Sequence, residues 1–497
     1  MAIAPLSHSA GWLRGISEAR NQMFDLQRQL TTGKKADLYS GLGGGGAIDT
    51  AVRMRARVDT LGAYQSSVKL VASRMDTMET VLGRYDALTR ETRTAVANTM
   101  PLADLPNPLT LKQQARYSLD EAVTLLNSEL GGRQLFSGRA LETEPVISAS
   151  KIIDGDPPLA GFDIVAADRL KADLGDDGLG RLDLGVTDST VTLSEDAAGS
   201  VFGFKISGVT STLGGDTTVT APAGDPAVTE VTFGATLPEK GQSISFKLDM
   251  PDGTSTTIKL TAVATPSEEK NTFVIGEDAD ETAANMKAAL QEAVGFAAKT
   301  ELSAASSFAA ANDFFDNDPP LRVDTSSLAL GEATGLRSGA DDTVRWYKGA
   351  NSSDPRSSSV ASVSDELDVK YGAQANEKEL RATLKNLAVM SVADYELPGK
   401  EGEGLYTAKS QRLITNLYGA AKGINEVRAD VAMQRVTVEK ADERNKLQKT
   451  TAEDLLGSVE DADINEVAVM LLQLQTQLQG SYQVTAMLSQ LSLVKLL

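Results

Sequence analysis

Three glycines near the N-terminus have the spacing of a nucleotide-binding motif. Gly41, Gly43 and Gly46 match the dinucleotide-binding glycine pattern, in which the backbone closely approaches a pyrophosphate. That pattern requires a strand immediately before the glycines, whereas residues 23–38 read as a helix. We therefore interpret residues 41–46 as a hinge between two helices rather than as a cofactor site.

A second segment resembles the first positions of a calcium-binding loop. Asp461, Asp463 and Asn465 supply alternating oxygen ligands of the kind such a loop uses. The sixth position is Glu466 where the loop needs glycine, and the twelfth is Leu472 where it needs glutamate. We interpret the acidic residues as the start of a helix, because a helix N-terminus favours negative charge.

The chain offers few groups for catalysis. It has no cysteine and one histidine, His8, which almost excludes a zinc, haem or thiol site. Adjacent acids such as Asp341–Asp342 and Glu268–Glu269 are typical of turns and exposed surfaces. No nucleophile, base and acid form a recognisable set. We predict that the protein is not an enzyme and has no catalytic residues, bound metal or cofactor.

The net charge of −20 is concentrated in the middle of the chain. Residues 145–370 contain 36 acidic and 17 basic side chains, whereas the remaining residues contain 32 acidic and 31 basic ones. This balance argues against nucleic acid as the principal partner. An acidic, hydrated middle between nearly neutral ends suits an outward-facing domain on an assembly, although a soluble acidic domain without special orientation fits as well.

The C-terminal segment combines an apolar stripe with polar interruptions. Its apolar and small residues alternate in steps of three and four, as in a heptad repeat. They fall at Ile464, Val467, Leu471, Leu474, Leu478, Ser481, Thr485, Leu488 and Ser492. Residues 467–497 contain a single charge, Lys495, but six glutamines interrupt them, so we predict no membrane insertion. A further apolar row through Met470 and Met487 favours a helix that packs in a bundle with other chains.

The N-terminal segment carries a matching stripe. Ile16, Ala19, Met23, Leu26 and Leu30 are again spaced by three and four residues. Two amphipathic helices at opposite ends of the chain are expected to pair with each other. The intervening chain would then be an insertion between them.

These patterns predict an α+β multidomain fold: N- and C-terminal helices form a joint coiled-coil-like bundle, and a β-rich α+β insertion lies between them. Residues 1–40 are expected to form a terminal helix that pairs with residues 455–497, the C-terminal polymerisation helix. Residues 41–144 and 371–454 are expected to contribute the two parts of a helical bundle domain. Residues 145–370 are the acidic insertion, with a possible boundary between two modules near residue 238. Prolines and glycines are expected to interrupt the helical pattern between these parts. They are Pro101, Pro106, Pro108, Pro398, Gly399, Gly402 and Gly404.

Local signals within the insertion are clearest around one hairpin and one helix. Residues 243–248 and 256–260 alternate as strands, and residues 249–253 between them have the composition of a hairpin turn. A helix is predicted over residues 280–294, with its cap near Asp278. Helical periodicity is otherwise weak in this region.

Three segments resemble the flagellin superfamily, and within it the proteins of the hook–filament junction. Residues 26–35, LQRQLTTGKK, are similar to the end of the family's first helix. Residues 131–138, GGRQLFSG, are similar to a glycine-x-tyrosine-leucine-phenylalanine-x-glycine signature and favour the junction proteins over filament flagellin. Residues 474–483, LQTQLQGSYQ, are similar to the shared terminal helix.

The resemblance implies a structural, extracellular subunit of the bacterial flagellum that joins hook to filament. It implies type III export without a cleaved signal peptide, with an export chaperone covering the C-terminal helix. The implied partners are other copies of the chain and neighbouring flagellar subunits, namely the hook-side junction protein and flagellin. Ten residues are the expected positions of helix packing within and between subunits. They are Ile16, Met23, Leu26, Leu30, Leu471, Leu474, Leu478, Tyr482, Leu488 and Leu491.

Two alternatives stay open on the sequence. The first is a filament flagellin with an acidic surface-exposed domain. The second is a cell-surface adhesin or binding protein whose β-rich, Thr/Ser-rich middle recognises a glycan or another surface.

Overall fold

The structure is a computed structural model that describes residues 6–99, 108–392 and 399–494. Contacts divide the chain into two compact units. The first contains residues 1–72, 361–369 and 436–497, and the second contains residues 73–360 and 370–435. The predicted interruptions at Pro101, Pro106 and Pro398 lie outside the described residues.

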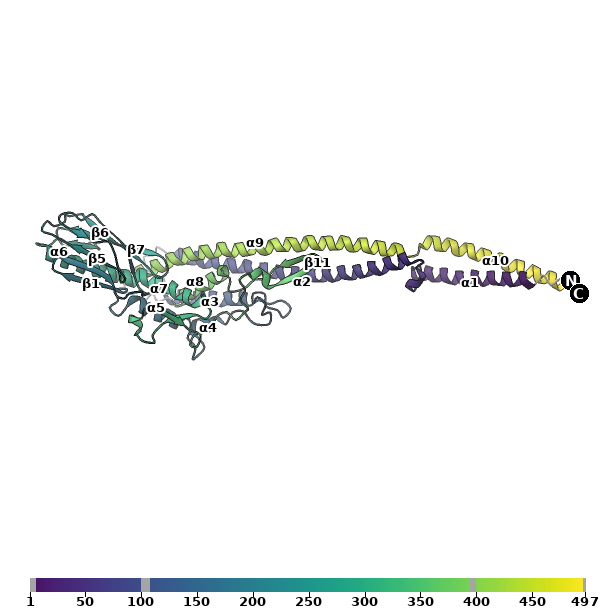
Figure 1. Cartoon of the computed structure of the whole chain (residues 1–497), viewed down its shortest axis with the longest axis horizontal. Coiled ribbons are helices and arrows are strands. Elements are labelled where there is room, and N and C mark those ends of the chain that lie inside the picture. The colour runs from purple at the N-terminus through teal and green to yellow at the C-terminus, as the bar shows by residue number, and fades with distance from the viewer. Residues whose placement is uncertain (1–5, 100–107, 393–398, 495–497) are drawn as a thin grey trace. The chain divides into compact units, whose positions relative to one another are not determined.

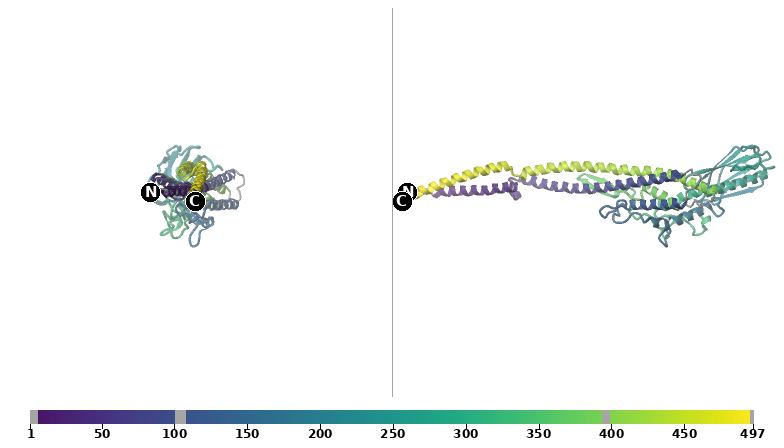
Figure 2. Two further views of the ribbon diagram at one scale, coloured as in Figure 1. Left: turned by 90° about the vertical axis from the view of Figure 1, so that its right-hand side faces the viewer. Right: turned by 180° about the vertical axis from the view of Figure 1, so that it is seen from behind.

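The first unit is built mainly from helices contributed by both ends of the chain. Helices α1 (Leu6–Thr32) and α10 (Ile464–Val494) lie side by side and run antiparallel (Figures 1 and 2). The unit also contains the beginning of α2 (Gly45–Thr99) and the end of α9 (Gly399–Glu460). A short 3-10 helix, η1 (Tyr39–Gly41), follows α1. The predicted pairing of the terminal helices is therefore present.

A two-stranded hairpin completes the first unit. It consists of β11 (Val360–Ser364) and β12 (Leu367–Lys370), which pair with each other. Asn445 on α9 donates through Nδ2 to the carbonyl of Val363 at 2.7 Å. On α2, Arg57 and Tyr64 both hydrogen-bond the carboxylate of Asp365. These hydrogen bonds lower the pKa of Asp365, so the hairpin is fastened by an ionised carboxylate.

The helical part of the second unit contains residues 73–99 of α2 and 399–435 of α9. It also contains α3 (Pro108–Leu126) and α8 (Lys378–Val392). Apolar residues that recur at heptad-like spacing on α2 and α9 are buried, as expected for helices that pack along one apolar stripe. They are Met75, Met78, Leu82 and Tyr85 on α2, and Leu413, Leu417, Ala420, Ile424, Val427 and Val431 on α9.

The inserted part of the second unit contains two four-stranded sheets. The first has the order β1-β2-β5-β4 and the second the order β3-β6-β7-β8. Neighbouring strands are antiparallel except β7 and β8. Their bounds are β1 (Leu182–Thr187), β2 (Thr190–Glu195), β3 (Lys205–Ser211), β4 (Thr218–Val219), β5 (Val228–Thr232), β6 (Ser243–Asp249), β7 (Ser255–Val263) and β8 (Thr272–Val274).

Helices complete this insertion. Both sheets share one hydrophobic core with α6 (Ala279–Ala297) and the π-helical turn η2 (Ala298–Leu302). Helix α7 (Ser303–Phe315) continues from η2 and packs against α5 (Phe162–Leu174), which follows α4 (Ala149–Asp154). The remaining elements are a small antiparallel pair and two 3-10 turns. They are β9 (Leu321–Val323), β10 (Leu336–Ser338), η3 (Leu330–Glu332) and η4 (Pro355–Ser358).

The fold class predicted from the sequence is confirmed: long terminal helices enclose a β-rich α+β insertion. The predicted hairpin is present as β6 and β7, with Gly253 in the turn at a φ of 81°. The predicted helix is α6, and its cap Asp278 accepts from the amide of Glu281 at 2.8 Å. The five-part division of the chain stays a prediction.

Two predictions of helix interruption are wrong. Gly402 and Gly404 lie inside α9, which begins at Gly399. A Cβ on Gly404 would come within 2.8 Å of the Thr300 methyl group, so this glycine permits close approach of α9 and η2 instead of ending a helix. Three helices of the insertion were also missed, namely α4, α5 and α7.

Candidate assembly surface

Part of each predicted stripe on the terminal helices, which contact each other, is shielded from solvent. Ile16, Met23 and Leu26 on α1 are half-buried, as are Leu471 and Leu474 on α10. The most buried predicted position is Leu478, at 5% exposure, and Val467 on the same stripe is equally buried. Steps of three and four place all these side chains on one face of each helix. The burial of these side chains supports packing within the helix pair, and their role as packing residues stays a prediction.

The other predicted packing residues are placed differently. Leu30 is 40% exposed and Tyr482 is 51% exposed. The side chains of Leu488 and Leu491 lie outside the described residues. The role of the ten predicted residues in contacts between subunits stays a prediction.

A second set of apolar residues points away from the helix pair. On α1 it includes Leu13 at 65% and Phe24 at 55% exposure. On α10 it includes Val469 at 65%, Leu472 at 63% and Met487 at 60% exposure. Burying one such side chain contributes roughly 1.5–3 kcal/mol, so exposed apolar residues of this size are candidates for an interaction site. We call these five residues the outer face; of them, only Met487 belonged to a row recognised in the sequence.

The helix pair is joined to the rest of its unit at two breaks between helices, where the backbone continues without helical structure. These two helix breaks lie next to each other. One break follows α1 and the other separates α9 from α10. The amide of Lys35 donates to the carbonyl of Glu460 at 2.8 Å, and the amide of Ala462 donates to the carbonyl of Gly33 at 2.9 Å. Gly33 has a φ of 69°, which favours glycine at the end of a helix. The two breaks therefore form one backbone-bonded joint, made of residues 33–35 and 460–462.

A buried carboxylate lies at the centre of this joint. The side chain of Glu460 is 7% exposed and accepts from Arg55 on α2 at 2.8 and 2.9 Å. Lys34 lies 3.5 Å from the same carboxylate and 2.5 Å from Asp461, whose hydrogen bond raises the pKa of Lys34. A buried charge needs such partners to offset its desolvation. The ion pairs of Glu460 and Lys34 thus reinforce the joint that the backbone hydrogen bonds form between residues 33–35 and 460–462.

Asp463 fulfils the helix-start role predicted for it. Its Oδ1 accepts from the amides of Asn465 at 2.9 Å and Glu466 at 3.2 Å, which satisfies two donors at the N-terminus of α10. Within the described ranges, no group of three or more acidic, histidine or cysteine side chains could hold a metal ion. Nor does any helix of the described chain have the length and apolarity needed to cross a membrane.

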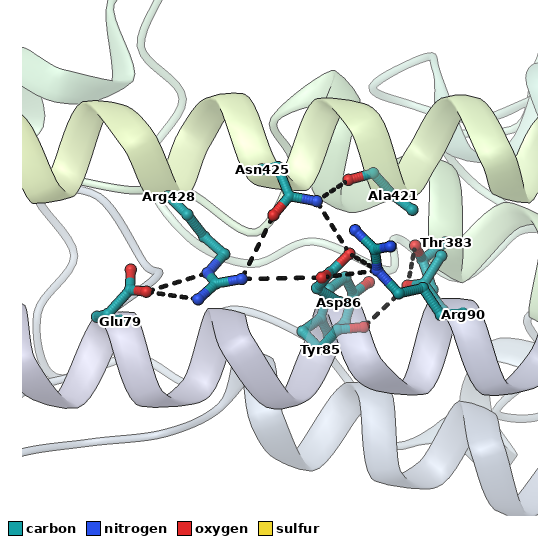
Figure 3. A network of polar contacts seen from close by, with 9 residues as sticks. Glu79, Tyr85, Asp86, Arg90, Thr383, Ala421, Asn425 and Arg428 are labelled. Carbon is teal, nitrogen blue, oxygen red and sulfur yellow. Dashed lines mark hydrogen bonds and ion pairs between the residues drawn. The ribbon is translucent and has the colours of Figure 1, made fainter.

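In the second unit, polar contacts join α2, α8 and α9 across their apolar stripes (Figure 3). Arg428 on α9 donates to Glu79 on α2 at 2.6 and 3.1 Å. The buried Asp86 accepts from Arg90 at 2.9 and 3.0 Å and from Asn425 at 3.2 Å. Such partners fix one register between helices that apolar packing alone would specify weakly.

Tyr85 and Thr89 extend this network to α8. The hydroxyl of Tyr85 donates to the carbonyl of Leu380 at 2.8 Å, and the Thr89 and Thr383 hydroxyls lie 2.9 Å apart. Complete burial raises the pKa of Tyr85, so its hydroxyl stays a proton donor. The α2–α8 contact is therefore polar at its centre as well as apolar along its length.

The glycine-rich segment 131–138 forms a tight turn after α3. Gly131, Gly132 and Gly138 all have φ between 64° and 71°. Phe136 is fully buried, and its carbonyl accepts from the amide of Ala375 at 2.9 Å. A Cβ on Gly138 would lie 2.7 Å from the carbonyl oxygen of Ala350. The sequence motif thus builds a turn that only glycines accommodate and that connects α3 to the chain near α8.

Comparison with known families agrees with these features at the N-terminal end. Residues 6–140 match the model of the bacterial flagellin N-terminal helical region, which spans α1, α2, α3 and the glycine-rich turn. A search of curated proteins found no match. Flagellins are structural, non-enzymatic proteins that are exported and self-assemble into an extracellular filament. The match of residues 6–140 supports assignment of the chain to the flagellin superfamily, as a structural subunit of the flagellum.

Proposed function

We propose that this protein joins the hook to the filament of the bacterial flagellum, in the role of hook-associated protein 3. It assembles outside the cell through its terminal helices, after type III export. Its partners are the hook-side junction protein and flagellin. An export chaperone covers the C-terminal helix until assembly.

The outer face carries the assembly part of this proposal. It places five large apolar side chains, each at least 55% exposed, on two helices that contact each other. In the cytoplasm they would promote aggregation unless covered, which explains the need for a chaperone. Between subunits, their burial would contribute on the order of 10 kcal/mol before the cost of ordering the termini.

The domain plan of the proposal follows the predicted divisions. Residues 1–40 and 455–497 form the polymer core, and residues 41–144 and 371–454 form the helical bundle domain. The acidic residues 145–370 then lie on the outside of the assembly, in one or two modules with a boundary near 238. The ten predicted packing residues and the outer face together supply the contacts within and between subunits.

The glycine-rich turn favours a junction role over a filament role. Residues 131–138 resemble the signature of junction proteins, and the buried Phe136 occupies its phenylalanine position. The alternative is a filament flagellin, which the match to the flagellin N-terminal region fits equally well. The two roles differ in copy number, because a filament contains many subunits and a junction few.

Quantitative mass spectrometry of sheared filaments and purified hook–basal bodies tests the proposal. Trace amounts at the hook-proximal end of the filament are expected for a junction protein. Bulk abundance along the filament would make the chain a flagellin. Its absence from both preparations would overturn the flagellar proposal and favour the cell-surface binding protein.

A further inference from the structure

A polar cleft of about 750 Å³ lies in the second unit. One face of α9 between residues 411 and 426 and one face of α8 between residues 378 and 386 line it. Three residues in and after the β6–β7 turn, Glu301 of η2 and two residues of α7 complete the lining. They are Asp252, Thr254, Ser255, Glu301, Phe308 and Asn312. Its volume is within the range of small-molecule sites, roughly 300–1,000 Å³.

The wall formed by α9 and the β6–β7 turn is rigid. Arg412, 12% exposed, donates to Asp252 at 2.9 Å, to Glu301 at 2.9 Å and to Thr254 at 3.1 Å. The Asp252 side chain is 7% exposed, so this ion pair is largely shielded from water. These hydrogen bonds hold the wall in place, and one guanidinium between two carboxylates leaves it with one negative charge, which the lysines elsewhere in the lining balance.

The opposite wall presents a buried acceptor that lacks a partner. Asn386 is 4% exposed, and its amide nitrogen donates to the carbonyl of Ala382 at 2.7 Å. Its Oδ1 has no hydrogen-bond partner among the described residues. A buried acceptor left without a donor costs about 1–3 kcal/mol. A ligand in the cleft with an O–H or N–H group would satisfy it.

The charges of the lining cancel. Four acidic and four basic side chains line the cleft, which disfavours polyphosphates and polyamines alike. The neutral lining groups are amides and hydroxyls, which both donate and accept hydrogen bonds. They are Thr254, Ser255, Asn312, Asn386, Gln411, Thr415 and Asn416.

We propose that this cleft binds a neutral polyhydroxylated ligand, namely a short oligosaccharide, free or as the end of a surface glycan. Hydroxyl groups are both donors and acceptors, so a saccharide matches the amides and hydroxyls of the lining and supplies the donor that Asn386 lacks. This binding activity is independent of the proposed assembly role, which uses α1 and α10.

Two glycines of long helices provide a matched test. A Cβ on Gly419, which lines the cleft, would meet nothing within 4 Å, so Gly419→Gln fills the cleft without a clash. Gly62 on α2 is equally open and lies in the first unit, so Gly62→Gln is the control. Asn386→Leu removes the unpartnered acceptor and should keep or raise the melting temperature.

The measurement is saturation-transfer NMR and calorimetry of the full chain with maltotriose, cellotriose and chitotriose. We expect saturable binding of at least one trisaccharide, at least a tenfold loss in Gly419→Gln and Asn386→Leu, and no change in Gly62→Gln. A sensor coated with ovalbumin, before and after enzymatic removal of its glycans, distinguishes a surface glycan from a free sugar. Failure of all three trisaccharides and of the glycan to bind, unchanged binding in Gly419→Gln, or binding only of tetralysine or tetraglutamate would overturn the proposal.

Discussion

The guanidinium of Arg55 lies 2.8 Å from a carboxylate oxygen of Glu460, although 405 residues separate the two in the chain. Arg55 is on α2 and Glu460 is the last residue of α9. Lys34, from the break after α1, also reaches this carboxylate. One buried side chain therefore holds three segments at the point where the terminal helix pair begins.

Replacing Glu460 by Gln should loosen this joint. The substitution removes the charge that Arg55 and Lys34 contact, and should cost roughly 1–3 kcal/mol of local stability. We expect faster hydrogen exchange at the amides of Lys35 and Ala462, which form the backbone bonds of the joint. Hydrogen-exchange mass spectrometry measures this directly. Glu453→Gln is the control: it removes the ion pair of Glu453 with Lys449, in which the two charged groups lie 3.8 Å apart at the surface, and should change little.

The two faces of α10 should respond differently to a charge. Leu478→Asp places a carboxylate in the buried contact with α1 and should unpair the terminal helices, seen as lost helical circular dichroism. Leu472→Asp alters only the outer face and should leave the monomer intact while blocking assembly, measured by sedimentation of polymerised protein. Normal polymerisation of Leu472→Asp would show that the outer face is not the contact between subunits.

Asp313 should give the second unit a stability that falls as pH rises. Desolvation raises its pKa to about 6, despite the ion pair with Arg169 at 2.5 Å. Between the unfolded pKa of about 4 and about 6, the folded state binds the extra proton, so this contribution is present at low pH and lost as pH rises through about 6. Its magnitude is at most about 3 kcal/mol.

Asp313→Asn tests this directly, because the amide resembles the protonated acid. The variant should match the native protein near pH 4 and exceed it in stability near pH 8, measured by denaturant unfolding. Asp341→Asn, at an exposed position, serves as the control. Parallel pH profiles for Asp313→Asn and the native protein would contradict the assigned cause.

Asp86 should be important for the register of α2 against α9. Asp86→Ala leaves Arg90 and Asn425 without their shared acceptor and should destabilise the second unit by about 2 kcal/mol. Thermal unfolding followed by circular dichroism measures the loss. Lys446 on α9, whose side chain is 60% exposed and pairs with Asp442, provides the comparison, since Lys446→Ala should be near neutral.

Two glycines of α9 should respond with opposite sign to alanine. In a helix, Gly→Ala ordinarily gains up to about 1 kcal/mol. At Gly419 the new methyl meets nothing within 4 Å, so stability should rise. At Gly404 it would lie 2.8 Å from the Thr300 methyl, so stability should fall. Equal shifts in melting temperature would contradict the close approach of α9 and η2.

Elements with local signals could be predicted from the sequence. The stripe of Met23 and Leu26, the cap at Asp278 and the turn at Gly253 all rest on patterns within a few residues. Helix α7 was missed because nearly all of its residues are buried, including Ala310 and Ala311, so no polar face alternates with an apolar one.

The assembly surface was only partly predictable for a different reason. A heptad stripe shows that a helix face will be buried, but not which helix will bury it. Leu478 of the predicted stripe is buried within the chain, whereas outward residues such as Phe24 and Leu472 are exposed. The joint at Glu460 depends on residues from three distant segments, which no local pattern connects.

The double connection at residues 33–35 and 460–462 has a mechanical consequence. A helix pair attached through a single connecting segment can rotate about that segment. Here two connecting segments cross the joint and are hydrogen-bonded to each other. Twisting the helix pair therefore requires breaking the backbone hydrogen bonds that the amides of Lys35 and Ala462 donate. A rotary load applied to the terminal helices is therefore passed into α2 and α9 rather than dissipated in a loose linker.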